Sequence, residues 1–389
     1  MSRPVLLLHC QHSLGLGHLA RALALADALS KHFRVVLASG GRMPDGVAVP
    51  EGVELVLLSP LSMGTDGVLV NPQDDRPVEA VQDARREQLL RLHDEVRPDV
   101  VLVELFPFGR RRFKSELLPL LEAARAAGAT IACSLRDILV ASRRDQAAHD
   151  EQAVTIANAF FDAVLVHADP RFARLEESLH AHTPLRVPVH HTGFVAPRSD
   201  RPAAPAQRER RVVVSAGGGA YGADLLRAAV EGHRLALAPQ GVATTLLTGP
   251  FLAPAVADEL QAAARELSGL EVRRQVPDLC AELATVAGSV SQCGYNTALD
   301  LIRSRVPALV VPFAEGREDE QTRRAERLER LGLLRMLPAA ELSGEAMARA
   351  LRALLDWRPA DARLDLDGGA ASARLLAGLA ARRTAEAAA

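Results

Sequence analysis

The first glycine-rich segment of the chain is the stretch "HCQHSLGLGHLA", residues 9–20. Gly15, Gly17 and Ala20 fit the dinucleotide-binding pattern G-x-G-x-x-G/A, in which a glycine turn at the start of a helix binds a pyrophosphate. The turn here is longer than that pattern requires, and the next predicted strand ends in "ASGGR" instead of an acidic residue that would bind a ribose. Arg42 in that stretch suits the 2′-phosphate of NADP, so an NADP-dependent oxidoreductase stays open as an alternative.

The same segment carries an imidazole in the first turn of the predicted helix. An unperturbed imidazole titrates near neutral pH, and the positive end of a helix dipole favours its neutral form, which accepts a proton. His18 is therefore the first candidate for a general base, and an ordinary structural histidine is the alternative. Glu104 and Asp137, at the ends of later predicted strands, are rival bases or ligands of an acceptor hydroxyl. His9, His12 and His18 match no standard metal-site spacing, so no metal is expected there. No other cofactor is expected.

A second set of polar residues lies in the region 288–332, which begins with "GSVSQCGYNTALD". A predicted strand there is followed by a turn at Gly294 and by a predicted helix that begins near Asn296 and Thr297. Helix N-termini present unpaired N–H groups and about half a positive charge, which suits a diphosphate. Asp300, one turn into the helix, suits the hydroxyls of a ribose, with an ordinary surface acid as the alternative.

Two further features accompany this region. Glu320 and Gln321 follow the next predicted strand and suit the hydroxyls of a sugar, with a solvated charged face as the alternative. The triple glycine in "SAGGGAYG" (residues 215–222) follows another predicted strand. Glycine allows a phosphate to approach the backbone closely, although a plain strand-to-helix turn uses glycine for the same lack of a side chain.

Short apolar strands alternate with helices around these residues. Strands are predicted at 4–10, 33–39, 53–59, 97–104, 129–137, 161–169, 186–194, 243–249, 270–276, 288–293 and 307–313, and the stretch 210–219 is predicted to be a strand that runs into the glycine loop. Such alternation is typical of doubly wound, mostly parallel sheets. A stretch rich in proline, alanine and charge, residues 196–210, is predicted to be a linker. The expected fold is therefore α/β, with an N-terminal Rossmann-like domain over 1–195, and a C-terminal one over 211–389 that includes the terminal helix. The two domains are expected to face a cleft.

Composition narrows the class of protein. The chain has 389 residues, of which 48% are hydrophobic and 3% aromatic, enough for two aliphatic cores. The formal net charge of −2 argues against a nucleic-acid-binding protein held by bulk electrostatics. Four cysteines without a C-x-x-C pair are typical of reduced core residues in a cytoplasmic protein. No signal peptide and no membrane-spanning segment is expected.

The order of these motifs resembles the GT-B glycosyltransferases, and most of all the family 28 enzymes typified by the peptidoglycan N-acetylglucosaminyltransferase. The resemblance covers nearly the whole chain and rests on "GLGHLARALALADAL" near the start, on "SAGGGAYG" and, most specifically, on the region 288–332. The stretches "VELFPFGRRRFKSELLPLLE" and "SLRDIL" are similar to a bacterial branch of that superfamily.

The resemblance implies a role for each matching residue. Thr297 and its turn would contact the diphosphate of a donor, Asp300 its ribose, and Gln321 with Glu320 its sugar. The backbone around Val276 would edge the base. The implied donor-binding residues are Gly217, Gly218, Gly219, Val276, Gly294, Asn296, Thr297, Asp300, Glu320 and Gln321. The residues expected on the acceptor side are Gly15, Gly17, Arg136 and His191.

The resemblance further implies an inverting, metal-independent transfer of a sugar from a nucleoside diphosphate sugar, a UDP-sugar by resemblance alone, to a hydroxyl acceptor. A lipid-linked sugar, a polysaccharide and a small metabolite all stay open as the acceptor. A nucleotide-sugar hydrolase or epimerase of the same fold is the main alternative, followed by a non-catalytic nucleotide-sugar-binding regulator and then by the oxidoreductase. The stretch "FPFGRRRFK" (106–114) suits either an anionic lipid surface or phosphorylated acceptor, or a solvated loop with inward-packed aromatics. The expected location is therefore the cytoplasm, with peripheral contact at the inner face of the membrane.

Overall fold

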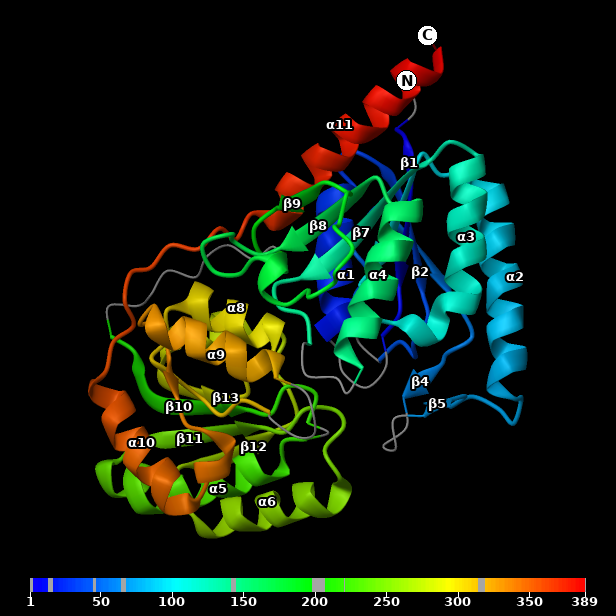
Figure 1. The fold of residues 1–389 in the computed structure, drawn as a ribbon. Helices are drawn as coiled ribbons and strands as arrows, with labels where there is room; N and C mark the ends of the chain where they lie inside the picture. Colours follow the sequence, from blue (N-terminus) through cyan, green and yellow to red (C-terminus); the bar gives the residue numbers. More distant parts are fainter. Residues whose placement is uncertain are drawn as a thin grey trace. The chain divides into compact units, whose positions relative to one another are not determined.

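A computed structural model of the chain describes residues 3–12, 17–44, 47–63, 68–140, 145–197, 207–219, 221–313 and 319–388. It confirms the α/β fold, with two parallel sheets that are each covered by helices (Figure 1). The chain divides into two compact units, and the division falls between Arg198 and Ser199, inside the expected linker. Part of that linker, 198–206, lies outside the described residues. The first unit holds Met1–Arg198 together with Leu364–Ala389, and the second holds Ser199–Arg363.

The sheet of the first unit has seven parallel strands in the order β3-β2-β1-β6-β7-β8-β9. Their bounds are β1 Val5–Cys10, β2 Arg34–Ser39, β3 Val53–Leu57, β6 Val100–Glu104, β7 Thr130–Arg136, β8 Ala163–His167 and β9 Val189–His191. Most are the continuous apolar runs predicted from the sequence, because a parallel strand is buried on both faces. The chain runs from β1 outward to β3 and then returns to β6 on the other side of β1. The strand order therefore switches direction between β1 and β6.

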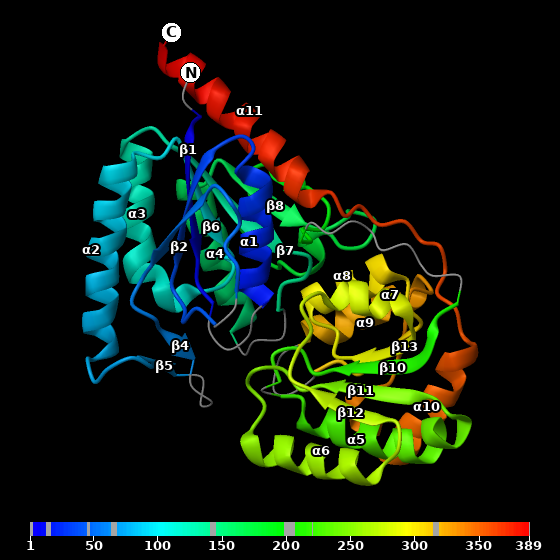
Figure 2. The ribbon, with the colours of Figure 1, turned by 180° about the vertical axis from the view of Figure 1, so that it is seen from behind.

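Helices cover both faces of this sheet, as Figures 1 and 2 show. Their bounds are α1 Gly17–Leu29, α2 Val78–Val96, α3 Lys114–Ala126, α4 Gln146–Phe160 and α11 Gly368–Ala388. Helices α1 and α11 lie on one face, and α2, α3 and α4 lie on the other. Two short 3-10 turns, Arg111–Phe113 and Leu175–Glu177, interrupt the loops. Between β3 and α2, Ser62–Met63 (β4) and Leu69–Val70 (β5) pair as a small antiparallel ladder.

The C-terminal helix packs on the first unit, so its predicted place in the second domain is wrong. Ala373, Leu376 and Ala380 of α11 are buried in the core that α1 shares with the first sheet. The chain leading to this helix is fixed there too, since the Phe194 N–H donates to the Asp365 carbonyl at 2.8 Å. The sequence shows the apolar stripe of this helix but not which of two aliphatic cores it covers.

The sheet of the second unit has six parallel strands in the order β12-β11-β10-β13-β14-β15. Their bounds are β10 Glu209–Ser215, β11 Ala243–Leu247, β12 Leu270–Arg273, β13 Val286–Ser291, β14 Ala308–Val310 and β15 Arg335–Met336. The helical segments are α5 Ala223–Gly232, η3 His233–Leu237, η4 Ala238–Gln240, α6 Pro254–Glu266, α7 Leu279–Thr285, α8 Tyr295–Ser304, α9 Glu320–Arg330, η5 Ala339–Glu341 and α10 Gly344–Asp356. The strand order switches direction between β10 and β13. Helices α5, α6 and α10 cover one face and α7, α8 and α9 the other (Figure 1).

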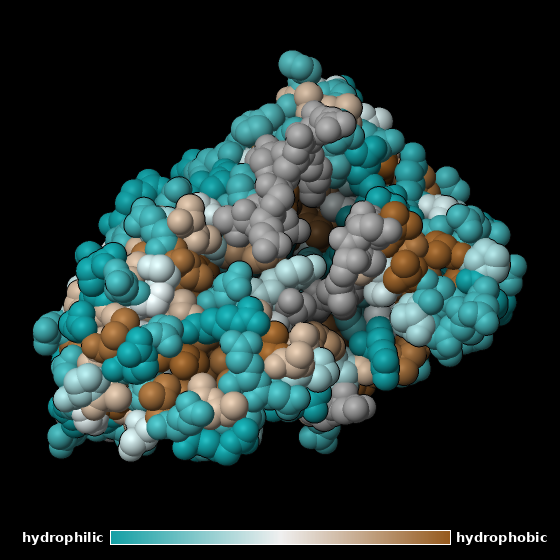
Figure 3. Space-filling model, turned by 90° about the horizontal axis from the view of Figure 1, so that it is seen from below, coloured by the Kyte–Doolittle hydropathy of each residue, from teal (hydrophilic) through white to brown (hydrophobic). Residues whose placement is uncertain are grey.

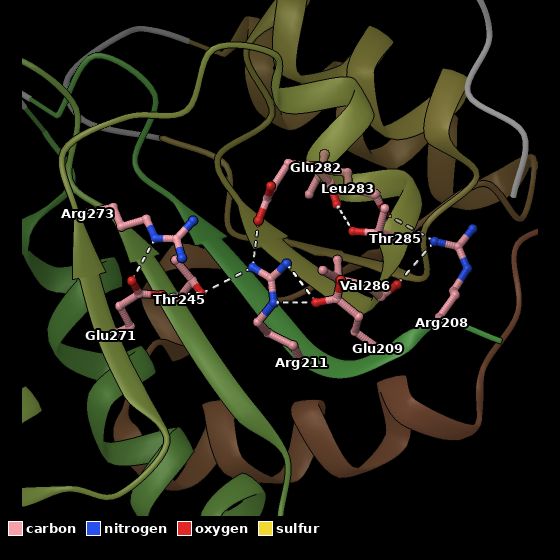
Figure 4. Close-up of polar contacts among 10 residues, drawn as sticks. All are labelled: Arg208, Glu209, Arg211, Thr245, Glu271, Arg273, Glu282, Leu283, Thr285 and Val286. Carbon is pink, nitrogen blue, oxygen red and sulfur yellow. Dashed lines mark hydrogen bonds and ion pairs between the residues drawn. The ribbon is translucent and has the colours of Figure 1, made fainter. Parts of the chain in front are cut away.

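Two arginines fix α7 and α8 to this sheet, as Figure 4 shows for α7. Arg211 on β10 donates to Glu282 of α7 at 2.6 Å and to the hydroxyl of Thr245 on β11 at 3.2 Å. Arg208 donates to the carbonyls of Leu283 at the end of α7 and of Ser304 at the end of α8, both at 3.1 Å. A cation at a helix C-terminus satisfies orphan carbonyls and opposes the negative end of the dipole. The N-termini of both helices are thereby held at the carboxyl edge of the sheet.

The surface is mainly polar. Figure 3 shows apolar residues as separate areas on a mostly hydrophilic face. The large hydrophobic side chains that are exposed are Leu57, Val68, Val70, Tyr221, Phe251 and Leu331. No helix among the described residues is long and apolar enough to cross a membrane.

Candidate active site

The first polar site lies where β1 and β6 end, at the switch point of the first sheet. Ligands of open α/β sheets bind outside the carboxyl ends of the strands at such a point. His18 lies in the first turn of α1, and Glu104 is the last residue of β6. The structure brings the two together, with His18 Nδ1 at 2.8 Å from Glu104 Oε1.

The hydrogen bond between His18 and Glu104 determines which nitrogen of the imidazole carries the proton. A carboxylate only accepts hydrogen bonds, so Nδ1 of His18 donates and Nε2 keeps its lone pair. The imidazole side chain retains 19% of its surface exposed, whereas Glu104 retains 1%. Burial lowers the pKa of His18 to about 3, against the opposing effect of the Glu104 charge. The imidazole is therefore neutral near pH 7 and available as a base.

Arg21, on the next turn of α1, is buried and donates to the same Oε1 of Glu104. Burial alone would raise the pKa of Glu104, but the charge of Arg21, the hydrogen bond from His18 and the charge of Arg110 lower it below its usual range. The carboxylate is thus ionised. Its second oxygen, Oε2, is buried and has no hydrogen-bond partner among the described residues.

The polar row continues across the neighbouring strands. Glu104 is in register with Ser134 on β7, and Arg136 at the end of β7 is in register with His167 on β8. Residues in register on adjacent strands share a face, which here is the face under α1. The Ser134 hydroxyl lies 2.8 Å from His167 Nε2, and Thr192 Oγ1 lies 2.9 Å from His167 Nδ1.

Other predicted acceptor-side residues are not joined to this row. Asp137 is buried, and its carboxylate accepts the N–H of Ile138 at 2.9 Å. The described contacts of His18 do not include Asp137. His191 is in register with Val166 and so lies on the opposite face from His167. Gly17 is the first residue of α1, and Gly15 lies outside the described residues.

The second polar site is a turn at the carboxyl edge of the second sheet, between β13 and α8. Gln321 Oε1 accepts hydrogen bonds from the main-chain N–H of Cys293 at 3.0 Å and of Phe313 at 3.2 Å. Arg324 Nη1 donates to the Cys293 carbonyl at 2.8 Å, and its guanidinium lies 5.9 Å from the centre of the Tyr295 ring. Side chains of α9 therefore hold the turn by both of its polar groups.

This geometry refines the predicted role of Gln321. Its side-chain carbonyl is occupied by two backbone N–H groups, so the amide NH2 is the part of the side chain left for a ligand. Glu320 beside it is buried and lies 4.0 Å from Arg324. Contact of either residue with a sugar stays a prediction.

Asp300 lies one turn into α8 with no hydrogen bond and no ion pair to another residue that the structure describes. Burial raises the pKa of Asp300 to about 7; the charge of Arg303 lowers it and that of Asp278 raises it. Asp278 caps the N-terminus of α7 by accepting the Ala281 N–H at 2.9 Å. Helix α7, which begins after the loop of Val276 and Asp278, packs against α8. The contacts of Val276 with a base and of Asp300 with a ribose stay predictions.

The triple glycine has two different roles. Gly219 has a φ of +89°, and a Cβ there would lie 2.3 Å from the Thr248 carbonyl, so close packing of two loops requires glycine. Gly217 has a φ of +59° but faces open space, and it is exposed. The carbonyl of Gly218 accepts the Phe251 N–H at 2.9 Å. Gly294, the N-cap of α8, also faces open space. The backbone at Gly217 and Gly294 is thus accessible to a ligand.

The second unit matches a known protein family. Residues 213–365 match the model of the glycosyltransferase family 28 C-terminal domain. The second unit is therefore similar to this C-terminal domain. This match covers the glycine loop after β10, the turn at Cys293 and the start of α9.

Relatives and solved structures agree with the family 28 domain. An uncharacterized glycosyltransferase of Methanopyrus kandleri is 30% identical over 169 residues, 43% of this chain and 44% of that protein. The UDP-N-acetylglucosamine--N-acetylmuramyl-(pentapeptide) pyrophosphoryl-undecaprenol N-acetylglucosamine transferase of Solibacter usitatus is 38% identical over 80 residues, 20% of this chain and 22% of that enzyme. The match therefore spans less than half the length of these relatives.

The spinosyn forosaminyltransferase SpnP superposes with a TM-score of 0.60 at 17% identity, over 98% of this chain and 96% of that one. This likeness shows the GT-B fold of two Rossmann-like domains. The matched family model describes a glycosyltransferase domain, whereas the solved structures show a shared fold alone.

Four residues of the two sites were missed by sequence reasoning: Arg21, Ser134, His167 and Arg324. Arg21 follows His18 by three residues and Arg324 follows Gln321 by three, a spacing that puts both members on one helix face. This spacing could have predicted Arg21 in α1 and Arg324 in α9 from the sequence. Nothing in the sequence pairs His167 with Ser134, since the two are brought together by strand register.

Proposed function

We propose that the chain is an inverting glycosyltransferase that moves a sugar from a UDP-sugar to a hydroxyl acceptor without a metal ion. The observation that carries this proposal is Asp300. It is a partly buried carboxyl without a partner among the described residues, one turn into the helix that follows Gly294, in the unit that matches the family 28 domain. Partial burial of a carboxyl that makes no hydrogen bond is unfavourable, and a ribose diol would supply such bonds.

The donor site is built from backbone and one carboxylate. The N–H groups in the first turn of α8, near Asn296 and Thr297, have no intrahelical acceptor and would bind the diphosphate. Gly217 would allow backbone to approach it, and Val276 would edge the base. UDP is chosen because the relative from Solibacter usitatus is named for a UDP-sugar donor.

The first site would supply the base. His18 Nε2 accepts the proton of the acceptor hydroxyl as its oxygen attacks the anomeric carbon. The bond from that carbon to the diphosphate oxygen breaks, and UDP leaves with the electron pair. One displacement inverts the anomeric centre. Glu104 is a positioning residue, since it holds Nδ1–H and stabilises the imidazolium that forms.

Charge on the leaving diphosphate would be balanced by helix N–H groups rather than by a metal. Activity retained in excess EDTA supports this part of the proposal, and loss of activity that Mg²⁺ or Mn²⁺ restores contradicts it. The proposal places the enzyme in the cytoplasm, and at the inner face of the membrane when the acceptor is lipid-linked. The name of the relative from Solibacter usitatus includes a lipid-linked acceptor, a pyrophosphoryl-undecaprenol.

Thermal-shift measurements with UDP, dTDP, GDP, CMP, their sugar conjugates and NADP, all in EDTA, test the donor site. A ligand at 100 times its dissociation constant stabilises a folded protein by about 2.7 kcal/mol. We expect UDP to raise the melting temperature of the wild type and of the control Asp258→Asn, but not of Asp300→Ala. Asp258 is an exposed acid of α6. A shift with NADP alone, or with none of these ligands, overturns the proposal.

A further inference from the structure

The loop after β6 carries Arg110 and lies at the same end of the sheet as the first polar site. Leu105 and Arg110 have φ values of +65° and +55°, a conformation that is uncommon for residues with a side chain. Phe106, Phe108 and Phe113 are buried and anchor the loop. The aromatic side chains of the basic stretch 106–114 therefore pack inward. They hold the loop that carries Arg110 in one conformation.

Arg110 differs from the other arginines buried nearby. Arg85 donates to Glu116 at 2.7 Å, and Arg21 donates to Glu104. The guanidinium of Arg110, by contrast, makes no hydrogen bond and no ion pair with any residue that the structure describes, and its Nε is buried. Burial lowers the pKa of Arg110, and the charges of Arg136 and Arg21 lower it further, against Glu104. Arg110 as a whole is only half-buried, so its guanidinium lacks partners within the described protein and is within reach of a ligand from solvent.

The surroundings of Arg110 are those of the proposed base. Its charge influences the pKa of His18, of His12 and of Glu104. Glu104 is already bound by His18 and Arg21, and it lies beyond ion-pair distance of Arg110. Among the residues that the structure describes, no second carboxylate lies at hydrogen-bond distance from Arg110.

We propose that Arg110 binds an anionic group of the acceptor, a phosphate or a carboxylate, beside the imidazole of His18. The identification of this ligand as the acceptor rests on the proposed function. The planar fork of a guanidinium matches the oxygens of phosphate and carboxylate, which it binds in pairs of charge-assisted hydrogen bonds. The acceptor is therefore an acidic sugar, sugar phosphate or phospholipid-linked sugar, and a neutral polysaccharide is excluded.

Titration of the full chain with an anion tests the site without the acceptor. Inorganic phosphate and, in a separate arm, acetate are added at constant ionic strength with saturating UDP present, and melting temperature is followed. Constant ionic strength removes general screening as a cause. We expect one of the two anions to raise the melting temperature of the wild type and of the control Arg112→Gln, whose exposed side chain lies two residues away.

The Arg110→Gln variant is expected to bind that anion at least tenfold more weakly, and Arg110→Lys to lie between the two. The arm that responds distinguishes phosphate from carboxylate. An equal response of the wild type and Arg110→Gln, or no response to either anion, overturns the proposal.

A rise in the melting temperature of Arg110→Gln with UDP shows that this variant is folded, and Arg110→Lys replaces it in the titration if it is not. Asp300→Ala, which is expected not to bind UDP, should respond to the anion as the wild type does, so the anion site and the donor site are tested separately. If anion binding depends on Arg110 while UDP binds nowhere, the anion site stands and the transferase proposal fails.

Discussion

Gln321 accepts a hydrogen bond from the main-chain N–H of Cys293 at a distance of 3.0 Å, through its side-chain carbonyl. Cys293 lies at the end of β13 and Gln321 in the first turn of α9, so this bond ties together two of the segments that build the donor side of the family 28 domain. Because the same oxygen also accepts the Phe313 N–H, one side chain sets the position of two strand ends.

The Gln321→Ala variant should be less stable than the wild type. It leaves two backbone N–H groups without their acceptor, and an unsatisfied buried group costs about 1–3 kcal/mol. The urea midpoint is therefore expected to fall, and UDP binding to weaken with it. The exposed Gln261→Ala in α6 is the control and should behave as the wild type. An unchanged midpoint in Gln321→Ala would mean that water replaces the lost acceptor.

Sequence reasoning located this region but not its internal order. A glycine turn and a polar helix start after an apolar strand predict the carboxyl edge of a sheet, which is where the turn lies. The sequence also predicted that Gln321 binds the hydroxyls of a sugar. That its carbonyl binds Cys293 depends on the packing of α9 against β13, which no local pattern encodes.

The first unit shows the same limit. Apolar runs predicted its strands, and strand ends predicted His18 and Glu104 as candidates on one edge. Their pairing depends on β6 lying beside β1, which follows from the topology and not from spacing along the chain. His191 was also predicted near a strand end, but the side-chain period of two places it on the other face.

Removal of the imidazole should abolish most of the transfer activity. General-base catalysis contributes about 10²–10⁴-fold, so His18→Ala is expected to lower kcat by that factor while the UDP shift is retained. The exposed His32→Ala is the matched control. Activity of His18→Ala near that of the wild type would assign the base to another residue.

Glu104→Gln separates orientation of the imidazole from its chemistry. The Glu104 charge raises the pKa of His18, so its loss lowers that pKa further and weakens the base. We expect kcat per folded enzyme to fall at least tenfold near pH 7 while the UDP shift is retained. A purely structural role of Glu104 would lower the amount of folded enzyme and leave kcat per folded enzyme unchanged.

Buried neutral histidines should make the protein sensitive to mild acid. Burial lowers the pKa of His9 to about 3, of His12 to about 4 and of His167 to about 3. Each folded-state pKa lies below the unfolded value of about 6.5, so the stabilisation is present above pH 6.5 and is lost as the pH falls toward the folded pKa. Each histidine contributes a loss of about 1.4 kcal/mol per pH unit in that window.

Urea unfolding at pH 7.5 and pH 5.5 measures this loss. His167→Gln is expected to be less stable at pH 7.5, because it disturbs the bonds to Ser134 and Thr192, but to lose less stability on acidification. The exposed His32→Gln should leave the pH dependence unchanged. The same pH dependence in His167→Gln as in the wild type contradicts the assignment.

Two glycines of the β10 loop should respond differently to alanine. A Cβ at Gly219 would overlap the Thr248 carbonyl and meets a positive φ as well, so Gly219→Ala should lower stability by about 2 kcal/mol or more. Gly217→Ala meets only the strain of its positive φ, about 1–2 kcal/mol, and should fold. Its UDP affinity should nevertheless fall, since the new methyl group occupies the open side of the loop. UDP titration of both variants is the measurement, and unchanged affinity in Gly217→Ala removes this loop from the donor site.

The affinity for UDP should depend on pH through Asp300. With a pKa raised to about 7 in the empty site, this carboxyl is mostly protonated at pH 6 and mostly ionised at pH 8. Because an ionised carboxylate is the better acceptor for two ribose hydroxyls, bound UDP favours the ionised form and lowers the pKa. Between pH 8 and pH 6 the dissociation constant of UDP should therefore rise by up to about tenfold, which corresponds to one pH unit below the pKa.

Asp300→Asn should bind UDP weakly at both pH values and lose this dependence, while Asp258→Asn keeps it. Calorimetric titration across pH 6–8 in buffers of different ionisation enthalpy would also show protons released on binding at pH 6. A dependence that persists in Asp300→Asn would place the titrating group elsewhere, with UDP itself as the first group to examine.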